Sequence, residues 1–166
     1  MPSTEAAAPR VIRRYLAAHG PATPAAFSAW LARGLGAGMV KRWFDAMQDE
    51  LAAVDVAGRP MQLLRSDVGS LHAQQPSDVV CLLGGFDQYL LGAGTDAEQI
   101  VPKEHRTKVS RTAGWISPVV VRGGRVVGTW TWEAAGGEVA LSLWETLPRA
   151  LSEPAVARIR SLLRAV

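Results

Sequence analysis

A run of basic side chains between residues 103 and 125 is the feature of this 166-residue chain best suited to binding chemistry. The run carries six basic residues and one acid, Glu104, so its local charge is +5, whereas the whole chain carries +3. Positive charge gathered on one surface attracts a polyanion, because each neutralised phosphate releases a condensed counterion. The pattern predicts a polyanionic partner, and a solubilising loop is the alternative interpretation. The basic residues are Lys103, Arg106, Lys108, Arg111, Arg122 and Arg125.

Three residues close to this run offer other chemistry. His105 could serve as a general acid or base oriented by the carboxylate of Asp87. A structural hydrogen-bonding role for His105, with Asp87 capping a turn, is the favoured interpretation. Trp115 follows a glycine beside the basic run, so we expect it to be the tryptophan available for stacking on an unpaired base. Helix and strand periodicity assigns four other tryptophans to packed faces: Trp30, Trp43, Trp130 and Trp132.

Composition excludes several classes of protein. The single cysteine, Cys81, allows no intramolecular disulfide and no cysteine-based zinc site, which favours a reduced, cytoplasmic setting. No apolar stretch approaches the length of a membrane span, and the three histidines lack the spacing of metal ligands. We therefore expect no membrane association, no metal and no cofactor. With 48% hydrophobic residues the chain can bury an ordinary core.

The first part of the chain, residues 1–68, shows the pattern of a winged helix-turn-helix. Apolar residues at helical spacing predict a first helix that stops near Gly20. Thr23 is expected to cap a second helix, and a third from Ala37 is expected to bury an apolar face as far as Leu51. Two short strands, Leu51 to Val56 and Pro60 to Leu64, then form the wing.

Three basic residues of this predicted domain are candidate DNA contacts. Lys41 and Arg42 lie on the polar face of the third helix, where a recognition helix contacts DNA, although Asp45 and Asp49 beside them would repel phosphate. Arg59 lies in the predicted turn of the wing. An ordinary solvated surface is the alternative for all three.

Residues 69–78 have neither helical nor strand period and predict a linker, after which residues 79–166 predict an antiparallel sheet and a closing helix. Gly123-Gly124 is expected to form a tight hairpin turn because glycine tolerates positive φ. We expect Val126, Gly128, Trp130 and Trp132 to share one face of their strand. The predicted strands are Val79 to Leu83, Trp115 to Val121, Arg125 to Trp132 and Val139 to Leu143. The predicted closing helix runs from Glu153 to Ala165. Its inward-facing residues are expected to be Val156, Ile159, Leu162 and Leu163, and its water-facing residues Arg158, Arg160 and Arg164.

Four segments, taken in their order along the chain, resemble the C-terminal half of the AlkZ-like winged-helix DNA-binding family. Tyr15 to Pro24, together with the predicted wing, resembles the middle winged helix of that family. The resemblance covers about Arg10 to Val166. It implies tandem winged helices that form a cleft for duplex DNA, in bacterial glycosylases that unhook alkylated or crosslinked purines. The four segments are Phe86-Asp87-Gln88-Tyr89-Leu90-Leu91-Gly92, His105-Arg106 with Val109, Gly114-Trp115-Ile116-Ser117-Pro118-Val119-Val120, and Gly124-Arg125-Val126-Val127-Gly128-Thr129-Trp130.

The family's catalytic signature, two polar residues flanking an apolar one, belongs to an N-terminal region upstream of the segments matched here. This chain has no such tripeptide, because no two of its glutamines are separated by one residue. The leading hypothesis is therefore an α+β protein that binds the phosphates of double-stranded DNA without catalysis. One alternative is part of a base-excision glycosylase whose catalytic N-terminal region lies elsewhere. The second alternative is a protein-interaction module that forms a homodimer.

The predicted DNA-contact residues form one set across both domains. They are Lys41, Arg42, Arg59, Lys103, His105, Arg106, Lys108, Arg111, Trp115 and Arg125.

Overall fold

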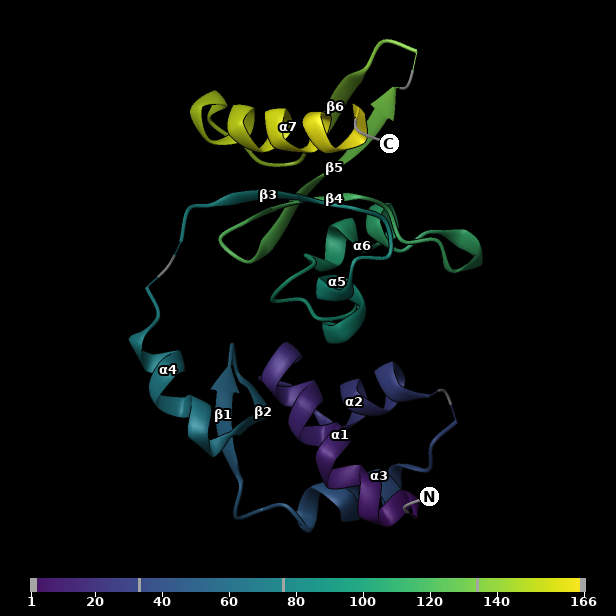
Figure 1. Cartoon of the computed structure of the whole chain (residues 1–166), viewed down its shortest axis with the longest axis vertical. Helices are drawn as coiled ribbons and strands as arrows, with labels where there is room; N and C mark the ends of the chain where they lie inside the picture. Colours follow the sequence, from purple (N-terminus) through teal and green to yellow (C-terminus); the bar gives the residue numbers. More distant parts are fainter. Residues whose placement is uncertain (1–2, 33, 76, 134, 165–166) are drawn as a thin grey trace. The chain divides into compact units, whose positions relative to one another are not determined.

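The computed structural model describes residues 3–32, 34–75, 77–133 and 135–164. The chain divides into two compact units (Figure 1). The first holds Met1–Gln74 together with Gln88–Gly94, and the second holds Gln75–Asp87 together with Thr95–Val166. Both combine helices with antiparallel strands, so the expected α+β class with a closing C-terminal helix is confirmed. No helix in the described residues is both long and apolar enough to cross a membrane.

Three helices open the first unit, and local caps fix where two of them begin. The Ser3 side chain accepts a hydrogen bond from the backbone N–H of Ala6, and the Thr23 hydroxyl accepts one from Ala26 at 3.1 Å. Each cap satisfies one of the N–H groups that a helix start leaves unpaired. The predicted Thr23 cap, with Pro24 first in the helix, is confirmed. The helices are α1 (Thr4–His19), α2 (Pro24–Leu31) and α3 (Ala37–Asp45).

The third helix is shorter than its apolar pattern predicts. It ends at Asp45, and turns lead from there to Leu51, the first residue of a strand. Met47 and Leu51 are nevertheless buried, at 3% and 5% exposure. The pattern therefore predicted the burial correctly but not the conformation, because strand pairing of Leu51 with Leu64 ends the helix first.

The predicted hairpin is present, with strands β1 (Leu51–Val56) and β2 (Arg59–Leu64). Its turn is Ala57-Gly58, both at positive φ, and the Asp55 carboxylate accepts a hydrogen bond from the backbone N–H of Gly58 at 2.8 Å. Arg59 pairs with Val56 as the first residue of β2, so its placement in the turn was wrong. A two-residue turn needs only residues that adopt positive φ, and the strand resumes at once.

Helical structure occupies much of the segment that was expected to lack period. A 3-10 turn, η1 (Arg65–Asp67), leads into α4 (Val68–Ala73). The Arg65 guanidinium donates to the carbonyl of Leu51 at 2.8 Å and to that of Asp49 at 3.0 Å, which ties the turn to the hairpin. One helix of six residues is too short for periodicity to reveal it.

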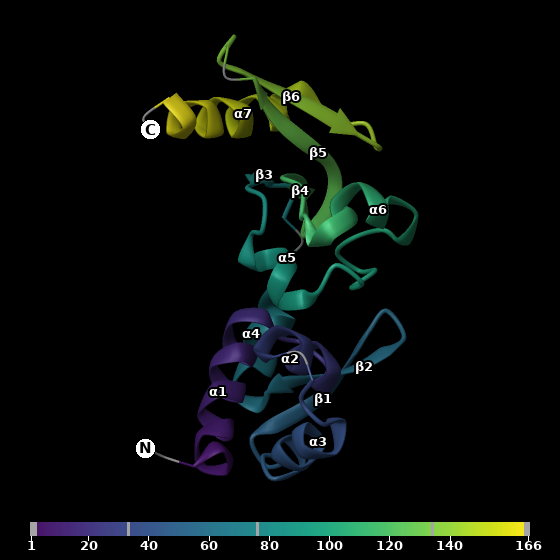
Figure 2. The same ribbon diagram turned by 90° about the vertical axis from the view of Figure 1, so that its right-hand side faces the viewer.

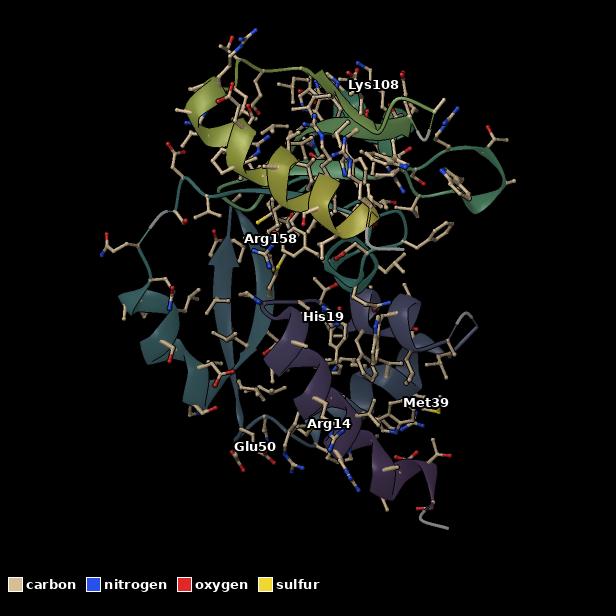
Figure 3. The ribbon with its side chains drawn as sticks, turned by 45° about the horizontal axis from the view of Figure 1, so that its top comes forward. Arg14, His19, Met39, Glu50, Lys108 and Arg158 are labelled. Atoms are coloured by element: carbon tan, nitrogen blue, oxygen red, sulfur yellow. The ribbon has the colours of Figure 1, made fainter. Side chains whose placement is uncertain are left out.

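An aromatic cluster forms the core of the first unit. The Tyr15 ring packs against Phe27 and Trp30, with ring centroids 5.3 and 5.0 Å away. Its hydroxyl donates a 2.9 Å hydrogen bond to the carbonyl of Gly92 in α5 (Gln88–Ala93). His19, at the C-terminal end of α1 (Figure 3), lies so close to Gly92 that a Cβ there would meet its ring. Trp30 packs here but keeps 36% of its surface exposed, so its assignment to a fully packed face was too strong.

The second unit is a four-stranded antiparallel sheet in the order β3-β4-β5-β6, as the predicted meander requires. Helix α7 lies against one face of this sheet, and the short helix α6 lies on the opposite side (Figures 1 and 2). Gly123 and Gly124, both at positive φ, form the predicted turn between β4 and β5. The elements are β3 (Val80–Leu83), β4 (Val119–Arg122), β5 (Arg125–Glu133), β6 (Glu138–Leu143), η2 (Lys103–His105), α6 (Arg106–Val109), η3 (Thr112–Gly114) and α7 (Arg149–Arg164).

A β-bulge changes the predicted faces of β5. Val120 pairs with Gly128 while the next residue, Val121, pairs with Val126, so Val127 has no partner opposite it. An extra residue shifts the side-chain alternation by one position. Val127 therefore joins Trp130 in the core beneath α7, instead of pointing to the face opposite.

Four smaller expectations for the second unit were wrong. The predicted strand from Val79 begins one residue later, at Val80, and Val79 and Cys81 are exposed. The segment from Trp115 to Pro118 lies outside β4, since Pro118 has no N–H to donate to a ladder. Leu162 is 57% exposed, whereas Leu151, Ala155, Ile159 and Leu163 form the stripe that packs on the sheet. The Nε atom of Arg160 is buried, although that side chain was expected to face water.

Replacing Tyr15 with Phe should lower the free energy of unfolding by about 1–2 kcal/mol. The substitution keeps the ring but leaves the buried Gly92 carbonyl without its donor. Urea denaturation measures the change, and an unaltered free energy of unfolding would contradict this role of the hydroxyl.

The Tyr15→Phe variant should also change how the free energy of unfolding falls at alkaline pH. Burial raises the pKa of Tyr15 from 10.0 to about 12, so the folded state holds the phenolic proton more tightly than the unfolded state. This stabilisation is complete below pH 10 and is lost as pH rises toward 12. In Tyr15→Phe that part of the decline should vanish, while Tyr89, whose pKa burial also raises, still contributes.

Replacing Gly128 with Ala should destabilise the protein by about 1–3 kcal/mol, the usual cost of overpacking. A Cβ at this position would lie 2.8 Å from the carbonyl oxygen of Ser142 and 2.7 Å from Leu143 Cδ2, on the paired strand. Gly136→Ala is the matched control, because its Cβ would meet only Glu138 Cγ at 3.6 Å. Equal thermal unfolding of the two variants would contradict tight β5–β6 packing.

Candidate nucleic-acid interface

Five of the predicted contact residues lie within nine consecutive residues of the second unit. Four of them are cations, and the segment contains one acid, Glu104, for a net charge of +3. We call this segment, Lys103–Arg111, the basic segment. It spans η2 and α6, and Val109 at its end is fully buried, which fixes it to the unit. The side chains of Lys103, Arg106, Lys108 and Arg111 remain exposed.

Hydrogen bonds hold the end of the basic segment against the chain that follows it. The backbone N–H of Ser117 donates to the Val109 carbonyl, and the Ser117 hydroxyl donates to the Lys108 carbonyl, both at 2.9 Å. Ser117 is buried, at 6% exposure. Ser117 therefore satisfies two of the carbonyl groups that the end of α6 leaves unpaired, and it ties this end of the helix to the following chain.

Trp144 anchors the basic segment to the sheet. The His105 ring stacks on the Trp144 ring with centroids 4.4 Å apart and planes at 25°, and Lys108 Nζ lies 5.6 Å from the same ring. Trp144 in turn donates from its indole to the Val126 carbonyl at 3.2 Å and from its backbone to the Val127 carbonyl at 3.1 Å. Trp144 was not among the predicted contact residues. Its signal was a sixth tryptophan directly after the last strand, one residue outside the alternating pattern.

The described contacts of His105 are those of a structural residue. Its Nδ1 atom is buried and has no hydrogen-bond partner among the described residues, so no carboxylate orients it there. Its contact with Trp144 supports the favoured interpretation, a structural residue, although through ring stacking instead of a hydrogen bond. Lys108 reaches the same indole, since residues three apart share a helix face.

Arg122, counted in the basic run, is neutralised. Its guanidinium donates two hydrogen bonds to the Asp78 carboxylate, at 2.8 and 3.0 Å. These bonds hold the pKa of Asp78 below its ordinary value, and Asp78 in turn raises the pKa of Arg122. Arg125 lies directly opposite Arg122 across the hairpin, so the Asp78 charge also offsets the repulsion between the two.

Arg125 itself is exposed at the start of β5, and one bond links its strand to the basic segment. The backbone N–H of Val126 donates to the carbonyl of Ile100 at 2.8 Å, three residues before Lys103. Arg125 therefore begins a strand that the chain leading into the basic segment contacts directly.

Trp115 and Arg111 face each other across a short turn. The Arg111 N–H donates to the Trp115 carbonyl at 2.8 Å, and Ser110 and Ile116 form a β-bridge beside it. Trp115 is 52% exposed, and its ring meets that of Phe86 edge to face at 5.2 Å. Of the aromatic residues near the basic segment, Trp115 was predicted to be available, whereas Phe86 was not considered.

Three of the predicted contact residues belong to the first unit. Lys41 is paired with Asp45 at 2.6 Å, one turn away, and Arg42 donates a long 3.4 Å bond to the Gly38 carbonyl. Arg59 is exposed at the start of β2. Pairing with Asp45 leaves Lys41 less charge to offer a phosphate than the cations of the basic segment.

No candidate metal centre coincides with these residues in the described part of the chain. No group of three or more His, Cys, Asp or Glu side chains there could hold a metal. One shallow pocket of about 390 Å³ lies on α7 and is lined by Ala157, Arg160, Ser161 and Arg164. None of the predicted contact residues lines it.

Known proteins share both the sequence and the fold of this chain. A curated relative from Streptomyces sahachiroi, named interstrand DNA cross-link repair glycosylase, is 51% identical over 131 residues, which cover 78% of this chain and 35% of the relative. The solved structure of Streptomyces sahachiroi DNA glycosylase AlkZ matches with a TM-score of 0.89 at 45% identity. That match covers 97% of this chain and 45% of the solved one. The chain thus spans less than half the length of either relative.

A family model extends the likeness to nearly every residue. The model described as DNA glycosylase AlkZ-like matches residues 1–165, which include the helices and hairpin of the first unit and the sheet, basic segment and α7 of the second. The resemblance seen in four short segments is confirmed by this match, and the chain belongs to the AlkZ-like DNA glycosylase family.

Proposed function

We propose that this chain is a DNA-binding part of a base-excision glycosylase that acts on alkylated or crosslinked purines, and that the basic segment binds phosphates of the duplex. Membership of the AlkZ-like family and the name of the Streptomyces sahachiroi relative, a cross-link repair glycosylase, support the reaction class. We therefore favour the alternative that this chain is part of a glycosylase over the leading hypothesis of a protein that only binds DNA.

The observation that supports phosphate binding is the difference between paired and unpaired cations in the second unit. Arg122 is held by Asp78, whereas no ion pair joins Lys103, Arg106 or Arg111 to a carboxylate among the described residues. A cation already paired loses that partner when it binds a phosphate, so its net gain is small. The exposed cations of the basic segment gain the full release of counterions.

Because the catalytic tripeptide is absent from this chain, the role proposed for it is to bind DNA and not to supply the catalytic groups. Cleavage of the glycosidic bond needs a fixed amide or carboxylate near C1′ of the extruded nucleotide. We propose that these groups are supplied outside the present 166 residues, by an N-terminal catalytic region of the kind that the family's longer members contain. The chain then positions the duplex while the catalytic region acts on the base.

The Arg106→Glu/Lys108→Glu double variant should weaken binding to every duplex to a similar degree, because phosphates carry no sequence information. With four phosphate contacts, the slope of log K against log salt should be about −3.6 for the wild type and about −1.8 once two contacts are lost. Fluorescence anisotropy of a labelled duplex at several salt concentrations measures both quantities.

The matched control is Arg149→Glu/Arg158→Glu, which makes the same change of charge at two exposed positions of α7. This control should bind with nearly the wild-type slope. Equal loss of affinity in both double variants would show that net charge, and not the basic segment, determines binding. Affinity that does not vary with salt would contradict the proposed phosphate contacts.

The chain alone should release no alkylated purine from duplex DNA that it binds. A single-turnover assay with excess protein measures release, and a complete glycosylase of the family serves as the positive control. Measurable release by this chain would overturn the assignment of the catalytic groups to another region. Loss of that release in the Arg106→Glu/Lys108→Glu variant would still leave the phosphate contacts standing.

A further inference from the structure

Two exposed aromatic rings form a pair in the second unit. Phe86 is 43% exposed and Trp115 is 52% exposed, although large aromatic side chains in a folded domain are usually well buried. Their rings meet edge to face, with centroids 5.2 Å apart and planes at 84°. In this arrangement the edge of one ring meets the face of the other, and part of the surface of both rings remains exposed to solvent.

Both rings lie at or near backbone positions of unusual conformation. Phe86 itself has φ of +60°, and Ala113, two residues before Trp115, has φ of +59°. Neither is glycine, and such conformations persist only where the surrounding structure determines them. The two loops also touch, since a Cβ on Gly85 would lie 2.9 Å from the Ile116 carbonyl oxygen. Phe86 and Trp115 are thus presented by two segments that fix each other.

Trp115 lies on the same loop as Arg111, a cation of the basic segment. Arg111 is bonded through its backbone to Trp115 at 2.8 Å and has no carboxylate partner among the described residues. A phosphate-binding cation and an aromatic face at short spacing form the arrangement with which proteins hold a single nucleotide. Exposed apolar area alone would not identify a ligand, but this combination fits a base and its own backbone.

We propose that Phe86 and Trp115 form a stacking site for an unpaired nucleobase of DNA. Trp115 offers its indole face to the base, Phe86 supports the indole from the side, and Arg111 contacts the adjacent phosphate. This inference rests on the proposed DNA binding and adds a preference for DNA in which one base is out of the stack.

The test compares three duplexes of one sequence: fully paired, with a one-nucleotide bulge, and with the bulged nucleotide made abasic. Wild-type protein should bind the bulge more tightly than its abasic counterpart by roughly 5- to 150-fold, the range of one stacked base. Trp115→Ala should abolish this ratio and leave affinity for the paired duplex nearly unchanged. Trp115→Phe should keep part of the ratio, because a smaller ring still stacks.

Two further variants separate stacking from indirect effects. Phe86→Ala should reduce the ratio, because the indole loses its side support, and Leu162→Ala removes an exposed apolar side chain of α7 and should leave the ratio unchanged. A wild-type ratio near one with normal binding of the paired duplex would overturn this inference and leave the proposed function intact. No binding to any of the duplexes would overturn both. A full ratio in Trp115→Ala would overturn the stacking site.

Discussion

The attachment of Trp144 to the start of β5 is the constraint on which the candidate site depends. One residue donates to the carbonyls of Val126 and Val127 and carries His105 and Lys108 on its ring. The basic segment contains only four residues of α-helix, too few to be stable by themselves. Its conformation is therefore supplied by what it packs on, and the indole provides a rigid, apolar surface whose one polar group is satisfied.

The β-bulge at Val127 also helps to fix the start of β5, to which Trp144 is attached. It lets Val127 enter the core beneath α7 with Trp130, while Val126 remains fully buried. The two consecutive valines thus fix β5 on both sides at the point where Trp144 binds. A regular strand would have placed Val127 on the face opposite Trp130, as the period-2 pattern predicted.

How far the sequence could predict this molecule differs between its parts. Elements with their own local signals were predicted well, such as the Thr23 cap and the Gly123-Gly124 turn, because caps and turns depend on a few neighbouring residues. The short α4, the early end of α3 and the bulge depend on packing or on a partner strand, which periodicity cannot represent. In the candidate site, the cluster of cations was visible from composition. The pairing of Arg122 with Asp78 and the anchoring role of Trp144 join residues 44 and 39 or 36 positions apart, so only the fold could reveal them.

The two kinds of interaction proposed for this chain, phosphate contacts and base stacking, respond differently to salt. Phosphate contacts weaken as salt rises, because their gain comes from released counterions. Stacking of a base on an indole has no such term, so its relative weight increases when electrostatic attraction is screened. Cations alone would hold any stretch of duplex equally. An aromatic pair held by strained loops next to Arg111 would favour the stretch in which a base has already left the helix, which is where base-excision chemistry acts.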